Sequence, residues 1–113
     1  MLVQAEDDQL TDILRRAIVA LTRRDSRDPT IRQLAVFLTV YLIKAPHTVR
    51  GLAATLNVRK SVITRALDQL GEQKLVRRVM DPADRRSVLA QPTETGAREL
   101  EKLRGAMLDA FQT

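Results

Sequence analysis

Apolar residues recur at helical spacing in five segments of the chain. In the first, about residues 7–24, they fall at every third or fourth position and leave one broad apolar face beside a charged one. The second, about residues 30–44, is apolar nearly all round and opens on the capping-box sequence Thr-Ile-Arg-Gln at Thr30, so we expect it to be the central buried helix. Pro46 ends it, because the residue before a proline is disfavoured in helical geometry.

The third and fourth segments predict two short helices joined by a tight turn. Thr48 is expected to cap the first of them, and Asn57 to take a left-handed conformation at its end. The helix after the turn spans about residues 59–73 and buries one face, which leaves a polar and basic face exposed. Its inward residues are Ile63, Ala66, Leu67 and Leu70. This layout is typical of a helix-turn-helix.

A strand pattern follows residue 74. Residues 75–80 and 87–92 predict two strands of a hairpin, and residues 81–86 the turn between them, in which Pro82 presets the backbone. The hairpin tip carries Arg85 and Arg86. A helix-turn-helix followed by a basic hairpin indicates a winged helix.

The expected fold is mainly α with a small β-hairpin wing, a winged helix-turn-helix flanked by N- and C-terminal helices. The whole chain, 1–113, is short enough to be one domain, with its DNA-binding core at 30–92. The flanking helices, 7–24 and 93–112, carry apolar stripes that either pack on their own domain or form a dimer interface, and we favour the dimer. The candidate interface residues are Leu10, Ile13, Leu14, Ile18, Leu100, Leu103, Met107 and Phe111.

Charge is concentrated in the middle of the chain. Residues 1–43 carry six arginines and six acids, whereas residues 44–91 carry ten Lys and Arg against four acids, and residues 92–113 carry three against four. The whole excess of the +5 net charge therefore lies in the middle segment. A localised basic block in a folded domain indicates a partner with a phosphate backbone.

Two cations stand where a helix disfavours them. Arg59 and Lys60 lie at the N-terminus of the 59–73 helix, where the helix dipole costs each a few tenths of a kcal/mol. A bound phosphate would relieve this cost. Arg77 or Arg78 on the first strand is a further candidate for phosphate binding.

Several other functions find no support in the sequence. Without cysteine there is no disulfide, thiolate or Cys-based metal site, and the single histidine, His47, is expected to be a surface connector residue, so neither metal nor cofactor is predicted. Paired carboxylates, a Ser/His/Asp set and a Gly-rich phosphate loop are all missing, so we expect no enzyme. The start lacks a secretory signal, and the longest apolar run, 34–43, is shorter than the about 20 residues of a membrane span, so we expect a cytoplasmic protein without membrane contact.

Residues 30–103, and Thr48–Gly96 most closely, resemble the MarR family of bacterial transcription regulators. The matching features are a short Leu-Ala helix, a Ser/Thr-rich recognition helix, Leu-Val-x-Arg, an Asp-Pro-x-Asp-Arg-Arg wing and Thr-x-x-Gly at the start of the last helix. The resemblance implies a homodimer on double-stranded DNA, with recognition helices in major grooves and wings in minor grooves. Contact residues carried over from it are Ser61, Thr64 and Arg65 on the helix, with Arg86 in the minor groove, Asp84 as the acid that orients it, and Arg85 as its basic neighbour.

The expected function is therefore sequence-specific DNA binding that regulates transcription, most simply as a repressor. Two alternatives remain open at this stage. The basic face could bind an acidic protein, in which case the winged helix is an interaction module. DNA binding could also be secondary to sensing of a small-molecule effector, although no distinctive pocket residues identify one.

Overall fold

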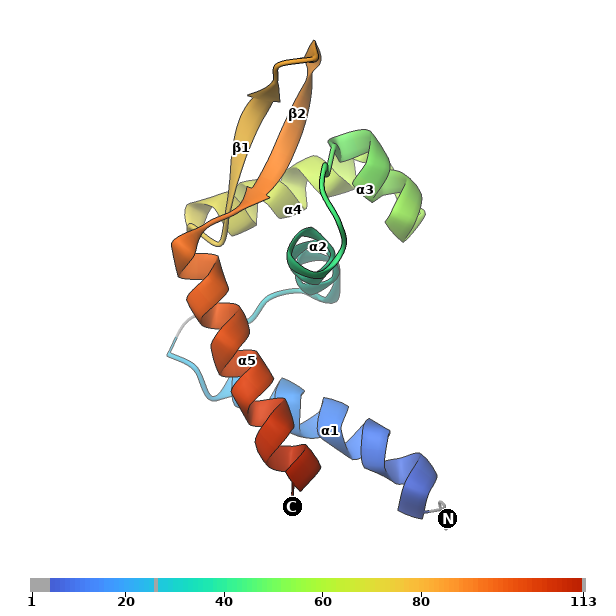
Figure 1. The fold of residues 1–113 in the computed structure, drawn as a ribbon, viewed down its shortest axis with the longest axis vertical. Coiled ribbons are helices and arrows are strands. Elements are labelled where there is room, and N and C mark those ends of the chain that lie inside the picture. The colour runs from blue at the N-terminus through green and yellow to red at the C-terminus, as the bar shows by residue number, and fades with distance from the viewer. Residues whose placement is uncertain (1–4, 26, 113) are drawn as a thin grey trace. The chain divides into compact units, whose positions relative to one another are not determined.

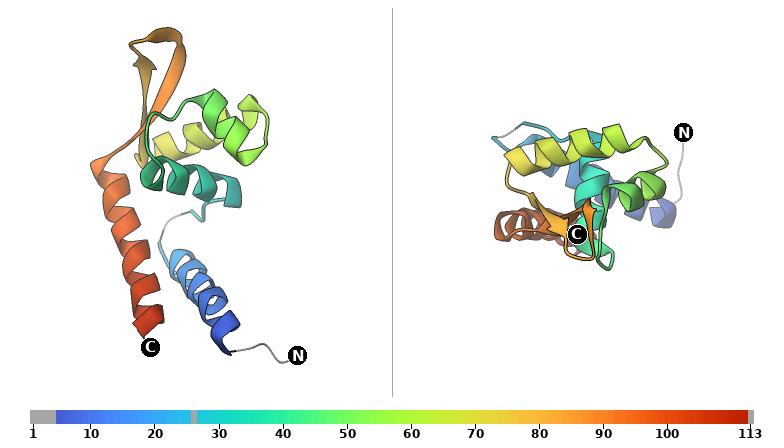
Figure 2. Two further views of the ribbon diagram at one scale, coloured as in Figure 1. Left: turned by 45° about the vertical axis from the view of Figure 1, so that its right-hand side comes forward. Right: turned by 90° about the horizontal axis from the view of Figure 1, so that it is seen from above.

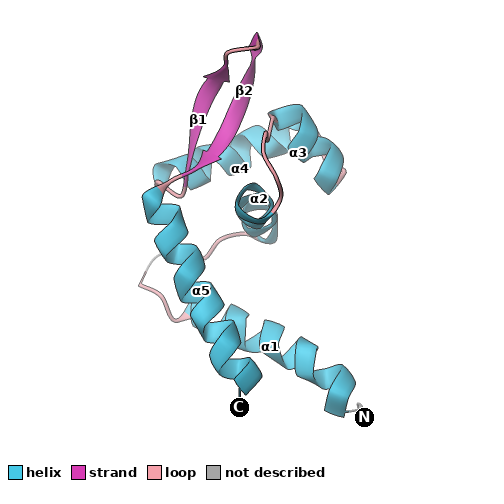
Figure 3. Ribbon diagram, in the orientation of Figure 1, coloured by secondary structure: helices cyan, strands magenta, loops and turns pink. Residues whose placement is uncertain are grey.

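The computed structural model describes residues 5–25 and 27–112 (Figure 1). Five helices and one hairpin follow each other along this part of the chain. Figure 3 shows the two strands of the hairpin in magenta among the cyan helices. The elements are α1 (Ala5–Thr22), α2 (Ile31–Leu42), α3 (Val49–Leu56), α4 (Lys60–Glu72), β1 (Val76–Asp81), β2 (Asp84–Pro92) and α5 (Glu94–Gln112). They form two compact units, one of Pro29–Ala97 and one that joins Met1–Asp28 to Arg98–Thr113.

The unit Pro29–Ala97 packs three helices against the base of the hairpin. The predicted inner face of α4 is confirmed, because Ile63, Ala66, Leu67 and Leu70 are all buried. They meet apolar residues from the other elements of the unit, and each fully buried aliphatic side chain stabilises it by about 1.5–3 kcal/mol. The other buried apolar residues of this unit are Val36, Phe37, Val40, Leu52, Ala53, Leu75, Val76 and Ala90.

The predicted helix ends agree with the structure. Thr30 Oγ1 accepts from Gln33 N at 3.0 Å and Gln33 Oε1 accepts from Thr30 N at 3.1 Å, which completes the capping box. Thr48 caps α3 by accepting from Gly51 N, and Asn57 ends it with φ 55°. Local sequence therefore sets where α2 and α3 begin and where α3 stops.

The expectation that the second helix is buried all round is wrong. Ile31 is 87% exposed, and Leu42 and Ile43 are also exposed. Only Val36, Phe37 and Val40 on one face are buried. The reason is that the unit has too few elements to surround the helix: α2 packs on α3, α4 and β2, which cover one side.

The second wing strand is longer than predicted, and the first is displaced by one residue along the chain. They pair in antiparallel register from Val76↔Pro92 to Met80↔Val88, and after a register shift Asp81 pairs with Asp84. The turn therefore shrinks to Pro82 and Ala83, where Asp81 Oδ1 accepts from the Ala83 N–H at 2.9 Å. The predicted turn at 81–86 was too long. Residues 84–86 are polar and show no alternation of apolar positions, so the sequence pattern did not indicate that they belong to the second strand.

His47 is not the surface residue that the sequence suggested. It is only 7% exposed, and its Nε2 donates to the Ile43 carbonyl at 2.8 Å. Its own carbonyl accepts from Ala90 N at 2.8 Å, and Thr48 forms a bridge with Leu89. Backbone pairing with β2 thus draws the α2–α3 connector against the wing, and this long-range contact buries His47.

Tyr41 joins three elements through one hydroxyl group. Its Oη donates to the Leu75 carbonyl at 2.5 Å and accepts from Thr93 N at 3.0 Å. Thr93 Oγ1 in turn donates to the Lys74 carbonyl at 2.6 Å and accepts from Gly96 N at 3.0 Å, which caps α5. The Tyr41 ring also lies 4.6 Å from that of Phe37, so α2, the start of β1 and the start of α5 are fixed together.

Tyr41→Phe should lower the free energy of unfolding by about 1–2 kcal/mol, because it leaves the Leu75 carbonyl and the Thr93 N–H without their partner. Urea unfolding followed by circular dichroism measures this change. An unchanged unfolding midpoint would show that water replaces the hydroxyl without cost.

The second unit pairs α1 with the C-terminal part of α5. Ile13, Ala17 and Leu103 are buried in it, and Arg24 Nη1 pairs with Glu99 Oε2 at 2.5 Å. Among the remaining apolar side chains of the two stripes, Leu100 is half-buried in the single chain, and the exposed ones are Leu10, Leu14, Ile18, Met107, Leu108 and Phe111. None of the described helices is long and apolar enough to cross a membrane.

Candidate nucleic-acid interface

The outer face of α4 presents the predicted recognition residues. Ser61, Thr64 and Arg65 are all exposed, opposite the buried face of the helix. Arg59 is the N-cap residue, but its side chain makes no capping hydrogen bond, and the first turn holds no acid. The N-terminus of α4 is therefore both uncapped and basic, as the sequence indicated.

The wing projects beyond α3 and α4, as Figure 1 and the left view of Figure 2 show. Arg86 on β2 is 94% exposed at its side chain. Asp84 Oδ1 accepts from Arg86 N at 3.1 Å and lies 3.5 Å from Arg86 Nε, while Asp84 Oδ2 accepts from Ser87 Oγ at 3.3 Å. Asp84 thus contacts both the backbone and the guanidinium of Arg86.

Asp84 has a pKa below the usual aspartate range. The largest cause is the hydrogen bond from the Arg86 backbone N–H, followed by those from Ser87 and the Arg86 side chain and by the charge of Arg50, while partial desolvation opposes them. A lowered pKa means that these groups favour the carboxylate, so their stabilising effect is fully present above the ordinary pKa, about 3.9, and disappears as the pH falls through the lowered value. The carboxylate form, which accepts these hydrogen bonds, therefore predominates at neutral pH.

A carboxyl NMR titration should find the Asp84 pKa lowered in the wild type. Arg86→Ala should keep much of this shift, because the backbone N–H that causes most of it remains, and Ser87→Ala should bring the pKa closer to the ordinary value. If Asp84 titrates in the wild type like an isolated aspartate, these hydrogen bonds do not form in solution.

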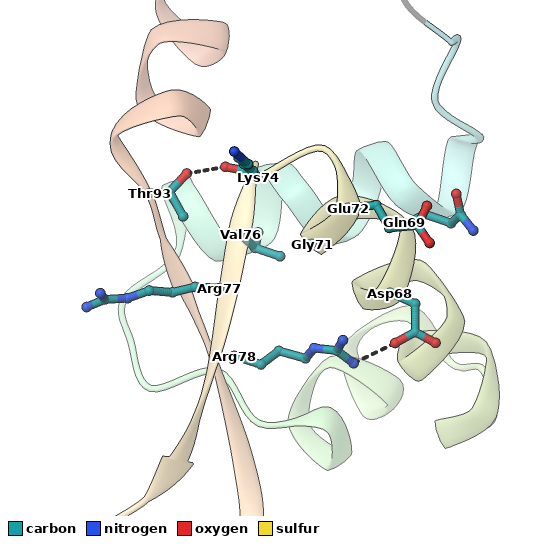
Figure 4. Close-up of a pocket in the computed structure, with 9 residues that line it drawn as sticks. All are labelled: Asp68, Gln69, Gly71, Glu72, Lys74, Val76, Arg77, Arg78 and Thr93. Atoms are coloured by element: carbon teal, nitrogen blue, oxygen red, sulfur yellow. Dashed lines mark hydrogen bonds and ion pairs between the residues drawn. The ribbon is translucent and has the colours of Figure 1, made fainter.

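Arg77 and Arg78 differ in what they contact. Arg78 Nη1 pairs with Asp68 Oδ1 at 2.7 Å, so it connects the wing to α4 (Figure 4). Arg77 donates from Nε to Gln91 Oε1 at 3.2 Å and points to the other side of the strand. The sequence did not predict the pairing of Asp68 with Arg78, although the two residues carry the opposite charges that such a contact requires.

Figure 4 shows the cavity beside this ion pair, between the C-terminal end of α4 and the base of β1. It has a volume of about 780 Å³, with acids from α4 and bases from the following segment on its walls. The lining residues are Asp68, Gln69, Gly71, Glu72, Lys74, Val76, Arg77, Arg78 and Thr93. Among the described residues, no group of His, Asp or Glu side chains could hold a metal ion.

A groove of about 320 Å³ separates α4 from the wing. It brings together Thr64 of α4 and Arg85 of β2, two predicted contact residues that are distant in sequence. Its floor is apolar, and Met80 and Val88, which are cross-strand neighbours, are exposed beside it. The other lining residues are Val49, Leu67, Arg78 and Val79. Met80 and Val88 carried no signal in the sequence beyond the strand pattern itself.

Three helices, the last two joined by a tight turn, followed by a two-stranded basic hairpin, define a winged helix-turn-helix protein. The model of the MarR family matches residues 27–87, more than half of the chain. The chain therefore belongs to the MarR family.

Solved structures show the same fold. The transcriptional regulator Tm0710 from Thermotoga maritima is 26% identical over 97% of this chain and 78% of its own, with a TM-score of 0.73. A mutant of MarR from Escherichia coli is 25% identical over 99% of this chain and 82% of its own, with a TM-score of 0.71. A mutant of MepR from Staphylococcus aureus, 18% identical over 99% and 81%, has a TM-score of 0.74. Curated protein sequences contain no match to the chain.

Proposed function

We propose that this protein binds specific sequences of double-stranded DNA and regulates transcription. The observation that carries the proposal is the exposure of two sets of groups in one compact unit: the outer face of α4, with its uncapped basic N-terminus, and Arg86 on the wing. In the proposed complex α4 lies in the major groove and the wing in the adjacent minor groove. A MarR-family fold supports this arrangement.

The contacts divide into those that position and those that specify. Arg59, Lys60 and Arg77 bind phosphates, which fixes the register of the protein without reading sequence. For this role we favour Arg77 over Arg78, because Arg78 is already paired with Asp68. On α4, Ser61, Thr64 and Arg65 read base edges, where a good arginine–guanine pair discriminates by about 1–3 kcal/mol.

The wing reads the shape of the minor groove. A narrow minor groove has an enhanced negative potential that attracts arginine. In our proposal Arg86 enters the minor groove and Asp84 orients it. Arg85, which lines the protein groove between α4 and the wing, adds a second positive charge. Asp84 is therefore a positioning residue rather than a direct DNA contact.

We propose a homodimer that represses by occluding a promoter in the bacterial cytoplasm. The exposed apolar side chains of α1 and α5 support a dimer, because a surface of this kind is covered in a stable oligomer. Leu14→Glu should then convert a dimer into a monomer, as measured by light scattering during size exclusion. A wild-type protein that is monomeric at micromolar concentration would contradict the proposed assembly.

Selection from a library of random duplexes tests the proposed function. A dimer should enrich a pseudo-palindrome whose half-sites are roughly 10 bp apart, one helical turn. Thr64→Ala should change the preferred base at one symmetric position and leave the spacing unaltered. The absence of any enriched motif, despite binding to the library, would overturn sequence-specific recognition.

A further inference from the structure

A second cavity lies against α4, on the flank opposite the wing. Thr64 and Leu67 line the groove that faces the wing, whereas Val62, Arg65 and Ala66 line this cavity. Its other wall is the start of α2, with Thr30, Arg32 and Gln33, and its volume is about 200 Å³. The recognition helix therefore has a lined depression on each side.

This cavity holds two positive charges without an acid. Arg32 comes from α2 and Arg65 from α4, and within the described parts of the chain neither side chain forms a hydrogen bond or an ion pair. On the other flank, by contrast, Arg78 is neutralised by Asp68 at 2.7 Å. Two like charges on one cavity repel each other, and an anion between them would remove that cost.

The backbone that carries Arg32 is rigidly placed. The reciprocal hydrogen bonds between Thr30 and Gln33, at 3.0 and 3.1 Å, fix the first turn of α2 on either side of it. The Gln33 side-chain oxygen accepts in this capping box, and the charged donors at the cavity are the two guanidinium groups. Arginine is well suited to such a site, because its planar fork binds phosphate oxygens in pairs.

The dimensions of DNA indicate which anion this is. A helix with its side chains is about 10–12 Å across, and the major groove is about 12 Å wide, so a helix lying in it meets the sugar-phosphate backbone on both flanks. We propose that Arg32, with Arg65 beside it, binds a backbone phosphate on the side of the major groove away from the wing. This inference rests on the proposed function, because it takes α4 to be the helix in the groove.

Arg32→Ala should weaken binding to every duplex by the same factor, roughly threefold to tenfold, and leave the preferred sequence unchanged. The slope of log affinity against log salt should become shallower by about 0.9 for each phosphate that the variant no longer binds. Arg32→Lys should keep most of the slope, because it keeps the charge. Arg23→Ala, which removes an arginine from the other unit, is the matched control and should change neither quantity.

Two results would overturn the inference while leaving the proposed function intact. One is that the wild type binds DNA and that Arg32→Ala has the same affinity and the same salt slope as Arg23→Ala. The other is a combination of two observations: inorganic phosphate binds saturably in calorimetry only when Arg32 is present, and the salt slope for DNA is the same with and without Arg32. That combination would assign the cavity to a free anion. A wild type that binds no duplex at low salt would instead refute the proposed function itself.

Discussion

Gly96→Ala should lower the free energy of unfolding of the Pro29–Ala97 unit by about 3 kcal/mol or more. A Cβ at this position would overlap the Tyr41 hydroxyl and the Leu75 carbonyl, the two groups that hydrogen-bond to each other beside it. Overpacking of a filled site costs about 1–3 kcal/mol, and loss of the Tyr41 hydrogen bonds adds to this. Urea unfolding measures the change, provided that the m-value stays constant.

A matched glycine gives the control. Gly71 lies in the last turn of α4, and a Cβ added to it would meet no atom within 4 Å, so Gly71→Ala should raise stability by up to about 0.5 kcal/mol through lower chain entropy in the unfolded state. The double variant Gly96→Ala with Tyr41→Phe should recover only part of the stability, because the Leu75 carbonyl remains in place. Equal stabilities of Gly96→Ala and Gly71→Ala would show that the α2–β1–α5 joint is looser than described.

Arg86→Ala should weaken DNA binding by about thirtyfold or more. The side chain is 94% exposed and is held at its base by Asp84, so its removal takes away the proposed minor-groove contact without disturbing the core. A dimeric variant lacks this contact in both half-sites, and about 2 kcal/mol in total corresponds to this factor. Fluorescence anisotropy with a selected duplex measures it.

A variant that keeps the positive charge at position 86 is the control for this prediction. Arg86→Lys should bind better than Arg86→Ala but below the wild type, because a lysine supplies a point charge without the planar guanidinium. Both variants should unfold at the same urea concentration as the wild type. DNA binding that is indifferent to Arg86→Ala would remove the wing from the proposed interface.

Local sequence predicted the elements whose causes are local. The capping box at Thr30, the cap at Thr48 and the left-handed Asn57 each depend on residues within a few positions, and all three are confirmed. The buried face of α4 followed from its helical period. The exposure of His47 and of Ile31 was predicted wrongly, because it depends on elements distant in sequence. His47 is buried because its backbone pairs with β2, and Ile31 is exposed because no described element covers it.

The candidate site divides in the same way. The exposed face of α4 could be predicted from its helical period, and the link between Asp84 and Arg86 was implied by the family resemblance. The Asp68–Arg78 ion pair and the cavity shared by Arg32 and Arg65 could not. Those depend on how β1 and α2 pack on α4, which no spacing along the chain specifies.

Binding to genomic duplexes across a salt series tests the central claim most directly. A winged helix that contacts several phosphates should bind at low salt and lose affinity linearly on logarithmic axes, with a slope of about −0.9 for each phosphate contact. Specific fragments should stay bound at salt concentrations that release the rest. A wild-type protein that binds no duplex at any salt concentration would contradict the account.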